Sequence, residues 1–218
     1  MVDESFSMLH HWDPIIKPIL EWVKPHRIVE IGVYEGALTR KLLEYLHGNE
    51  TEGQADAKLI GIDPFPKFDG LKNHHLLELH EDISLNVLPN IQNYQIVIID
   101  GDHNYFTVYN ELQIIDTTFQ DMDYTPVILC HDTVSCGVND SYWADAFGTE
   151  SHVPQEFVNH PQNRGLVRAI QDFIYNSPLP WKVEWHEDYP GVAVLWCGNF
   201  PREGKIISLS GTGKAVKK

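Results

Sequence analysis

Residues 95–105 of the chain, QIVIIDGDHNY, place a continuous apolar run directly before a segment of aspartate, glycine and histidine. A run without polar alternation predicts a strand over 95–99 that is buried on both faces, as strands of parallel sheets are. A helix is predicted from Tyr105 to Phe119, because apolar residues recur there at helical spacing. A strand followed by a helix is the repeating unit of a parallel α/β sheet.

The same alternation of short apolar runs and helical patterns extends through the chain. Strands are predicted at 27–31, 58–62, 77–80, 95–99, 127–130, 181–185 and 192–196. Helices are predicted at 13–23, 37–46, from 105 onward and at 166–174. The last two strands flank HEDYPG, which predicts an antiparallel hairpin. The pattern predicts one α/β fold: a doubly wound, mostly parallel seven-stranded sheet with helices on both faces and a C-terminal antiparallel hairpin.

The chain divides into three parts by composition and pattern. Residues 1–26 are expected to form an N-terminal helical segment, with Asp13 as the N-cap before Pro14. Residues 27–200 are expected to form the α/β domain, and 201–218 a flexible tail.

The loop at 133–163 is long for a compact domain, and such loops are usually functional or disordered. We expect it to fold over the edge of the sheet as a lid that shapes a ligand pocket. Tyr142 and Trp143 would either stack against a ligand or pack on the core or at a dimer contact. Arg164 and Arg168 would either bind an acidic group of a substrate or balance local acidic charge.

The chain has 218 residues and a formal net charge of −15, from 31 acidic and 16 basic side chains. A field of this sign repels phosphate backbones and anionic membranes, so we expect neither nucleic acid nor a membrane as a partner. No apolar run approaches the roughly 20 residues of a membrane span. The three cysteines lack CxxC spacing, and the polar N-terminus does not resemble a signal peptide, so we expect a cytoplasmic protein. Trp12, near the start, is expected at a homodimer contact.

Polar and glycine residues follow the predicted strands. They are Glu30 and Gly32, then Asp63, then Asp100 to His103, and finally His131 and Asp132. Because parallel strands end at the same edge of a sheet, we expect these residues to lie together, at the edge where such sheets bind ligands.

The first of these turns is VEIGVYEG, residues 29–36. Tyr34 occupies the position of the second glycine in G-x-G-x-x-G, which disfavours a dinucleotide and hence a nicotinamide-dependent oxidoreductase. The turn suits a ligand without phosphates. Glu30 would anchor a cationic amino group and Asp63 would accept ribose hydroxyls. Alternatively, each glycine only forms a turn and Asp63 only caps a helix.

Four segments in this order, VEIGVYEG, IGIDPFP, IVIIDGDHNY and VILCHDT, resemble class I S-adenosylmethionine-dependent methyltransferases. More narrowly, IDGDHNYFTVYNEL followed by HDT is similar to the methyltransferase 24 branch of small-molecule O-methyltransferases, over roughly residues 25 to 197. The resemblance implies S-adenosylmethionine as cofactor within 27–200, and a hydroxyl of a small molecule, a sugar or a sugar-bearing natural product, as acceptor. It assigns Glu30, Gly32 and Gly36 to the methionine part, Asp63 to the ribose, and Asp82 with Ile83 to the adenine.

The segment from Asp100 to His103 is the predicted chemical site. The acceptor hydroxyl must lose a proton as it attacks the methyl group, and histidine is the natural general base near neutral pH. His103 is therefore the predicted base, with Asp100 beside it. In related metal-dependent enzymes a lysine stands at the place of His103, so this chain departs from their pattern.

The resemblance also implies a divalent metal held by Asp100 and by the residues after the fifth strand. Here the segment reads His131-Asp132-Thr133, so Asp100 and Asp132 match the pattern and the third ligand departs from it, with His131 or Thr133 having to serve. The expected ligands are Asp100, His131 and Asp132. Magnesium prefers oxygen ligands, whereas an imidazole favours manganese, iron or zinc, so magnesium and manganese both stay open. Alternatively, Asp100 only caps the following helix, and the chain is a non-catalytic nucleoside- or partner-binding domain of the same fold.

Overall fold

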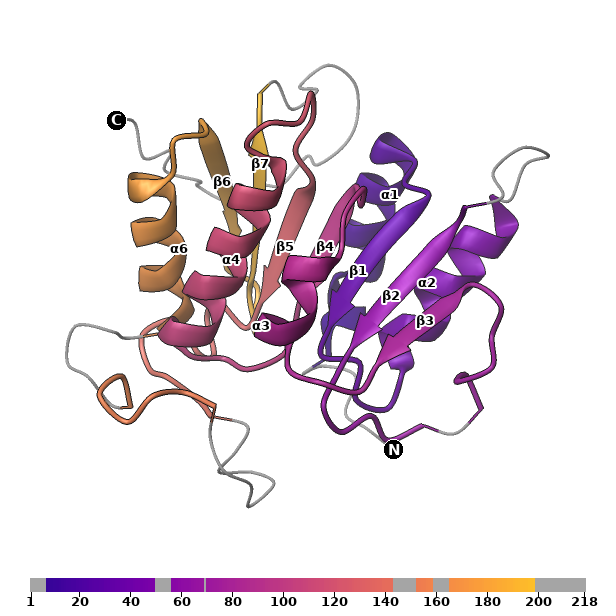
Figure 1. Cartoon of the computed structure of the whole chain (residues 1–218), viewed down its shortest axis with the longest axis horizontal. Helices are drawn as coiled ribbons and strands as arrows, with labels where there is room; N and C mark the ends of the chain where they lie inside the picture. Colours follow the sequence, from indigo (N-terminus) through magenta and orange to yellow (C-terminus); the bar gives the residue numbers. More distant parts are fainter. Residues whose placement is uncertain (1–6, 50–55, 69, 143–151, 159–164, 199–218) are drawn as a thin grey trace.

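The computed structural model describes residues 7–49, 56–68, 70–142, 152–158 and 165–198 (Figure 1). The predicted tail at 201–218 lies outside these residues, as do Trp143 and Arg164. Of the predicted lid at 133–163, the described parts are 133–142 and 152–158.

A seven-stranded sheet with the order β3-β2-β1-β4-β5-β7-β6 forms the centre of the molecule. Its strands are β1 (Arg27–Ile31), β2 (Lys58–Ile62), β3 (Leu77–His80), β4 (Ile96–Ile99), β5 (Val127–His131), β6 (Trp181–His186) and β7 (Val192–Cys197). Strands β1 to β5 pair in parallel, whereas β7 is antiparallel to both β5 and β6. This order confirms the predicted doubly wound sheet with its C-terminal hairpin.

Helices cover both faces of the sheet (Figure 1). One face carries α3 (Ser84–Val87), the short η4 (Leu88–Asn90), α4 (Tyr105–Phe119) and α6 (Gly165–Asn176). The other carries η2 (Met8–His11), η3 (Trp12–Ile16), α1 (Lys17–Val23) and α2 (Ala37–Gly48). The sequence did not predict α3 or η4, because elements of four and three residues are too short to show helical periodicity.

The N-terminal segment begins differently from the prediction. The helical turns start at Met8, and the hydroxyl of Ser7 accepts a hydrogen bond from the Leu9 N–H. Asp13 lies inside η3, so its prediction as an N-cap is wrong. The earlier start buries Met8 and His11, which the pattern of residues 13–23 does not include. The helix ends as expected before Pro25, with Lys24 in a left-handed conformation.

Strand β4 shows why a continuous apolar run was informative. Val97 and Ile99 pack in the cluster under α4 and α6, whereas Ile96 and Ile98 pack in the cluster under α1 and α2. All four side chains are buried. The strand is therefore fixed at the centre of the sheet, and the loop after it has a rigid support.

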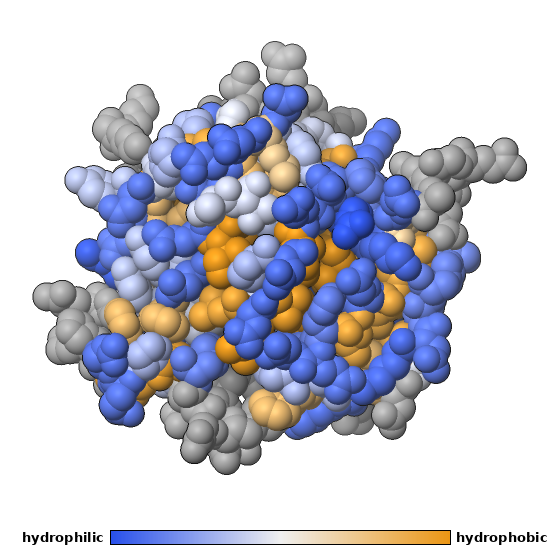
Figure 2. All heavy atoms as spheres, viewed as in Figure 1, coloured by the Kyte–Doolittle hydropathy of each residue, from blue (hydrophilic) through white to orange (hydrophobic). Residues whose placement is uncertain are grey.

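Hydrophilic residues cover most of the face seen in Figure 2, and apolar residues show across its middle. Among the described helices, none combines the length and the apolar character that crossing a membrane would need.

Candidate functional site

The parallel strands β1 to β5 all end at the same edge of the sheet, the lower edge in Figure 1. Asp100 directly follows β4, and His131 is the last residue of β5, followed by Asp132. His103 lies in the short loop between Asp100 and α4. The structure thus brings together the four residues that the sequence analysis placed at the chemical site.

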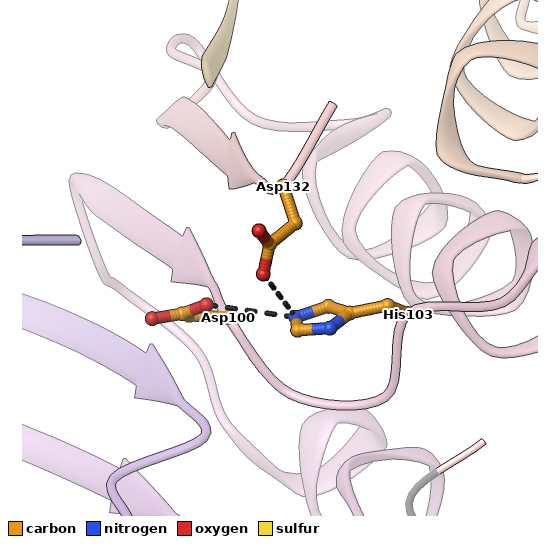
Figure 3. A group of neighbouring side chains, drawn as sticks. All are labelled: Asp100, His103 and Asp132. Atoms are coloured by element: carbon orange, nitrogen blue, oxygen red, sulfur yellow. Dashed lines mark ion pairs between the residues drawn. The ribbon is translucent and has the colours of Figure 1, made fainter. Parts of the chain in front are cut away.

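These four side chains form a compact cluster of two carboxylates and two imidazoles. Asp100 Oδ1 lies 2.8 Å from His131 Nδ1 and 3.5 Å from His103 Nε2. Asp132 Oδ2 lies 3.2 Å from His131 Nδ1 and 3.3 Å from His103 Nε2. Figure 3 shows both carboxylates directed at the ring of His103. One nitrogen of each imidazole is therefore close to one oxygen of each carboxylate.

The cluster is strongly coupled electrostatically. Burial alone would raise the pKa of Asp100, but the His131 and His103 rings hold it well below its usual range. Burial also disfavours a charged His131, yet Asp100 and Asp132 raise its pKa to about 9. The same carboxylates, with Cys136, raise the pKa of His103 well above its usual value despite burial. Without another cation, the two carboxylates therefore favour the doubly protonated, cationic form of both rings.

The arrangement fits a divalent metal ion. One ligand atom each from Asp100, His103 and Asp132 lies within 4.8 Å of the other two. His131 Nδ1 faces the same carboxylate oxygens, Asp100 Oδ1 and Asp132 Oδ2. Two carboxylates and an imidazole are a common donor set for divalent ions. Among the described residues, no other group of at least three side chains meets this distance criterion.

Close packing of the backbone holds Asp100 in place. A Cβ atom at Gly32 would lie 2.0 Å from the carbonyl oxygen of Asp100, and Gly32 has a φ of +86°. Only glycine fits this conformation without strain. Gly32 therefore lets the turn after β1 approach the end of β4, in addition to any contact with a ligand.

Glu30 lies at the end of β1 and is 1% exposed. Within the described part of the chain, its Oε2 atom has no hydrogen-bond partner. Burial, together with Asp100 and Asp63, raises its pKa to about 8. A buried carboxyl with an unused oxygen is suited to receive a cationic group from a ligand.

Asp63 is fixed by backbone donors. Its Oδ2 accepts a hydrogen bond from the Tyr34 N–H, and its Oδ1 accepts one from the Phe65 N–H, both at 2.7 Å. Because each carboxylate oxygen can accept more than one hydrogen bond, both can still meet hydroxyl groups. The carboxylate thus joins the turn after β1 to the loop after β2.

The remaining predicted cofactor residues lie around this edge. Gly36, with a φ of +71°, is the N-cap residue of α2. A Cβ atom there would lie 3.1 Å from the side chain of Phe68, a neighbour that the sequence analysis did not identify. Asp82 is exposed and accepts a hydrogen bond from the Ile83 N–H, just before α3.

Two buried groups near the cluster were also not predicted. The ring of His11 lies 5.7 Å from that of His131, between ring centres. Glu111 on α4 accepts a hydrogen bond from the Ser84 hydroxyl at 2.5 Å, and burial raises its pKa to about 8. The sequence held no signal for either residue, because both lie in elements whose contacts arise only on folding. Arg168 pairs with Asp172 on its own helix, which matches the local-charge alternative.

Comparison with family models matches residues 29–133 to a methyltransferase domain of the methyltransferase 24 family. No curated protein sequence gives a match.

Solved structures with the same fold include several methyltransferases. The MycE methyltransferase of mycinamycin biosynthesis, in complex with Mg, S-adenosylhomocysteine and mycinamycin VI, has a TM-score of 0.55 and 20% identity. That match covers 94% of this chain but 54% of MycE. Podospora anserina methyltransferase PaMTH1, bound to S-adenosylhomocysteine, has a TM-score of 0.53 and 15% identity over 83% of this chain and 75% of that one. The O-methyltransferase TomG from Streptomyces achromogenes, in complex with S-adenosylmethionine, has a TM-score of 0.50 and 15% identity. That match covers 84% of this chain and 77% of TomG.

Proposed function

We propose that this chain, whose residues 29–133 form a methyltransferase domain on a class I methyltransferase fold, transfers a methyl group from S-adenosylmethionine to a hydroxyl of a small molecule. The observation that carries this proposal is the position of His103 Nε2. It lies 3.5 Å from Asp100 and 3.3 Å from Asp132, at the carboxyl ends of the central strands.

His103 is the proposed general base. Its Nε2 atom would accept the proton of the acceptor hydroxyl while the oxygen forms its bond to the methyl carbon and the carbon–sulfur bond breaks. S-adenosylhomocysteine and the methyl ether are then the products. His103 can accept this proton only when it is neutral, but the negative charges of Asp100 and Asp132 favour its protonated form. The base function therefore requires those charges to be balanced.

A divalent cation held by Asp100, His131 and Asp132 would supply that balance and would lower the pKa of the acceptor hydroxyl. Magnesium and manganese are the proposed ions, and the imidazole of His131 favours manganese over magnesium. In this arrangement His131 is a ligand and His103 is the base, although the group of side chains that meets the distance criterion contains His103 and not His131. Manganese binding to H103Q therefore decides between the two rings.

The cofactor would lie along the ends of β1, β2 and β3. Glu30, Gly32 and Gly36 are proposed to hold its methionine part, and Asp63 its ribose. Asp82 and Ile83 are proposed to hold the adenine. The buried Oε2 of Glu30 supports this assignment, because the amino group of the cofactor is the cation that such an oxygen would receive.

The proposed acceptor is a sugar or a sugar-bearing natural product. The resemblance to the methyltransferase 24 branch supports this class, and MycE, of similar fold, has been crystallised with mycinamycin VI. The loop at 133–163 is proposed to cover the acceptor, with the half-buried Tyr142 forming a wall of its pocket. We also propose a cytoplasmic homodimer, with the partly exposed Trp12 at the contact.

Calorimetry on the metal-stripped protein and an activity assay together test the proposal. S-adenosylhomocysteine should bind in the micromolar range, and E30Q should weaken that binding. Manganese should bind the wild type and H103Q with similar affinity if His103 is the base. Loss of manganese binding in H103Q would instead make His103 a ligand.

Activity is measured by transfer of labelled methyl groups to methyl α-L-rhamnopyranoside, with catechol as the non-sugar probe. Methylation of catechol alone would overturn the sugar assignment. Binding of S-adenosylhomocysteine without methylation of either probe would favour the alternative of a non-catalytic nucleoside-binding domain.

A further inference from the structure

Asp140 lies in the connection after β5 and joins the N-termini of two helices. Its Oδ1 accepts hydrogen bonds from the N–H groups of Tyr105 in α4 and Gly165 in α6, both at 2.9 Å. Its Oδ2 accepts a hydrogen bond from the Tyr142 hydroxyl at 3.1 Å. The first N–H groups of a helix have no partner within the helix and carry partial positive charge. One carboxylate therefore satisfies both helix ends.

Ser141, the residue after Asp140, contacts the loop between β4 and α4 that carries His103. The Ser141 N–H donates a hydrogen bond to the carbonyl oxygen of His103 at 2.9 Å. Asp140 holds the N–H of Tyr105 on the other side of Asn104. The backbone directly after His103 is thus fixed on both sides of Asn104 by two consecutive residues of a distant segment.

The same connection after β5 also contacts Asp132, on the β5 side of the candidate site, through Cys136. The Cys136 N–H donates to the carbonyl oxygen of Asp132 at 2.8 Å, and the Cys136 carbonyl accepts from the Leu166 N–H at 3.1 Å. A short stretch of chain therefore links Asp132 to His103. The side chains of Asp132, just after β5, and of His103, in the loop after β4, lie 3.3 Å apart, and this stretch contacts the backbone of both residues.

We propose that Asp140 is a positioning residue for His103: by holding the start of α4, it sets where the imidazole lies relative to Asp100 and Asp132. Asp140 touches none of the reacting atoms. The proposal rests on the proposed function, because it assigns Asp140 a role in placing the general base.

Asp116 provides the matched control for a merely structural role. It lies near the other end of the same helix and is buried. It accepts hydrogen bonds from the Ser177 hydroxyl at 2.8 Å and from Trp181 Nε1–H at 2.6 Å. Like Asp140, it connects α4 to other elements, but it does not contact the loop of His103.

The experiment compares D140A, D140N and D116A with the wild type. Carbethoxylation of His103 by diethyl pyrocarbonate in the manganese-loaded protein, where the ring is expected to be neutral, followed by peptide mass spectrometry, reports the accessibility of the ring without any acceptor. D140A should raise this rate several-fold. D140N should stay near the wild-type rate, because asparagine keeps an oxygen acceptor for both helix N–H groups. D116A should lower the melting temperature without changing the rate at His103.

The methyl transfer assay gives the second measurement. D140A should lower kcat by about ten-fold or more, since small displacements of a catalytic group have effects of this size. Its affinity for S-adenosylhomocysteine should stay unchanged, and D140N should recover most of the rate. If D140A does not fold, D140S replaces it, because the serine hydroxyl is one bond shorter than the carboxylate and does not reach both helix N–H groups; the rise in carbethoxylation rate should then be smaller but in the same direction.

An unchanged carbethoxylation rate in D140A, or an equal rise in D116A, would overturn the proposal. So would a D140N variant that behaves like D140A. If the wild type methylates neither probe, the proposed function fails, while the carbethoxylation rates still decide whether Asp140 positions His103.

Discussion

Nδ1 of His131 lies 2.8 Å from Oδ1 of Asp100, although His131 ends β5 and Asp100 directly follows the neighbouring strand β4. His131 is 1% exposed, so its ring cannot turn away into solvent. This pair places an imidazole where an all-oxygen site would have a carboxylate or a carbonyl, and it defines the chemistry of the proposed metal site.

Replacing His131 by glutamate should change the preferred metal. H131E supplies an oxygen donor instead of a nitrogen, which favours magnesium over manganese. The ratio of manganese to magnesium affinity, measured by calorimetry, should fall by about ten-fold, the size that altered ligands and their partners commonly give. H80Q is the matched control, because His80 forms an exposed pair with Glu78 at 2.9 Å. An unchanged ratio in H131E would remove His131 from the ligand set.

Gly32→Ala should disturb both stability and the site. The added Cβ would lie 2.0 Å from the Asp100 carbonyl oxygen, at a φ of +86°. We expect a loss of about 1–3 kcal/mol or more in urea denaturation, together with weaker manganese binding. G48A is the control, because a Cβ at Gly48, in helix α2, meets nothing within 4 Å. Equal effects of both substitutions would show that close packing at Gly32 is unimportant.

Glu111 should make stability depend on pH. Burial raises its pKa from the ordinary value of 4.5 to about 8 in the folded protein. The folded state therefore binds an extra proton between these values, and the stabilisation present below about pH 4.5 is lost as the pH rises through 8. E111Q should make this fall less steep when urea denaturation is measured from pH 5 to 8, while Glu30, whose pKa burial also raises to about 8, keeps its own contribution. E44Q, on the exposed face of α2, should leave the slope as in the wild type.

Much of the fold could be predicted because its signals are local. The apolar run before Asp100 specifies a central strand, and the residue after such a strand must lie at the edge of the sheet. His103, His131 and Asp132 could be placed near Asp100 for the same reason, without knowledge of any side-chain direction.

Contacts between distant segments could not be predicted in this way. Asp13 has the local features of an N-cap, but burial of Met8 and His11 moves the start of the helical turns to an earlier residue. Asp140 has no periodic pattern around it, and its role depends on two helices that meet only in the folded chain. Local propensity does not encode such partners.

Methyl transfer by the wild type and by H103Q, with manganese present and the S-adenosylhomocysteine affinity of both proteins measured in parallel, tests the central claim most directly. We predict that the wild type methylates methyl α-L-rhamnopyranoside. H103Q should lose about a hundred-fold in kcat, as expected for loss of a general base, with unchanged S-adenosylhomocysteine affinity. Equal turnover by the two proteins would contradict the assignment of His103 as the base.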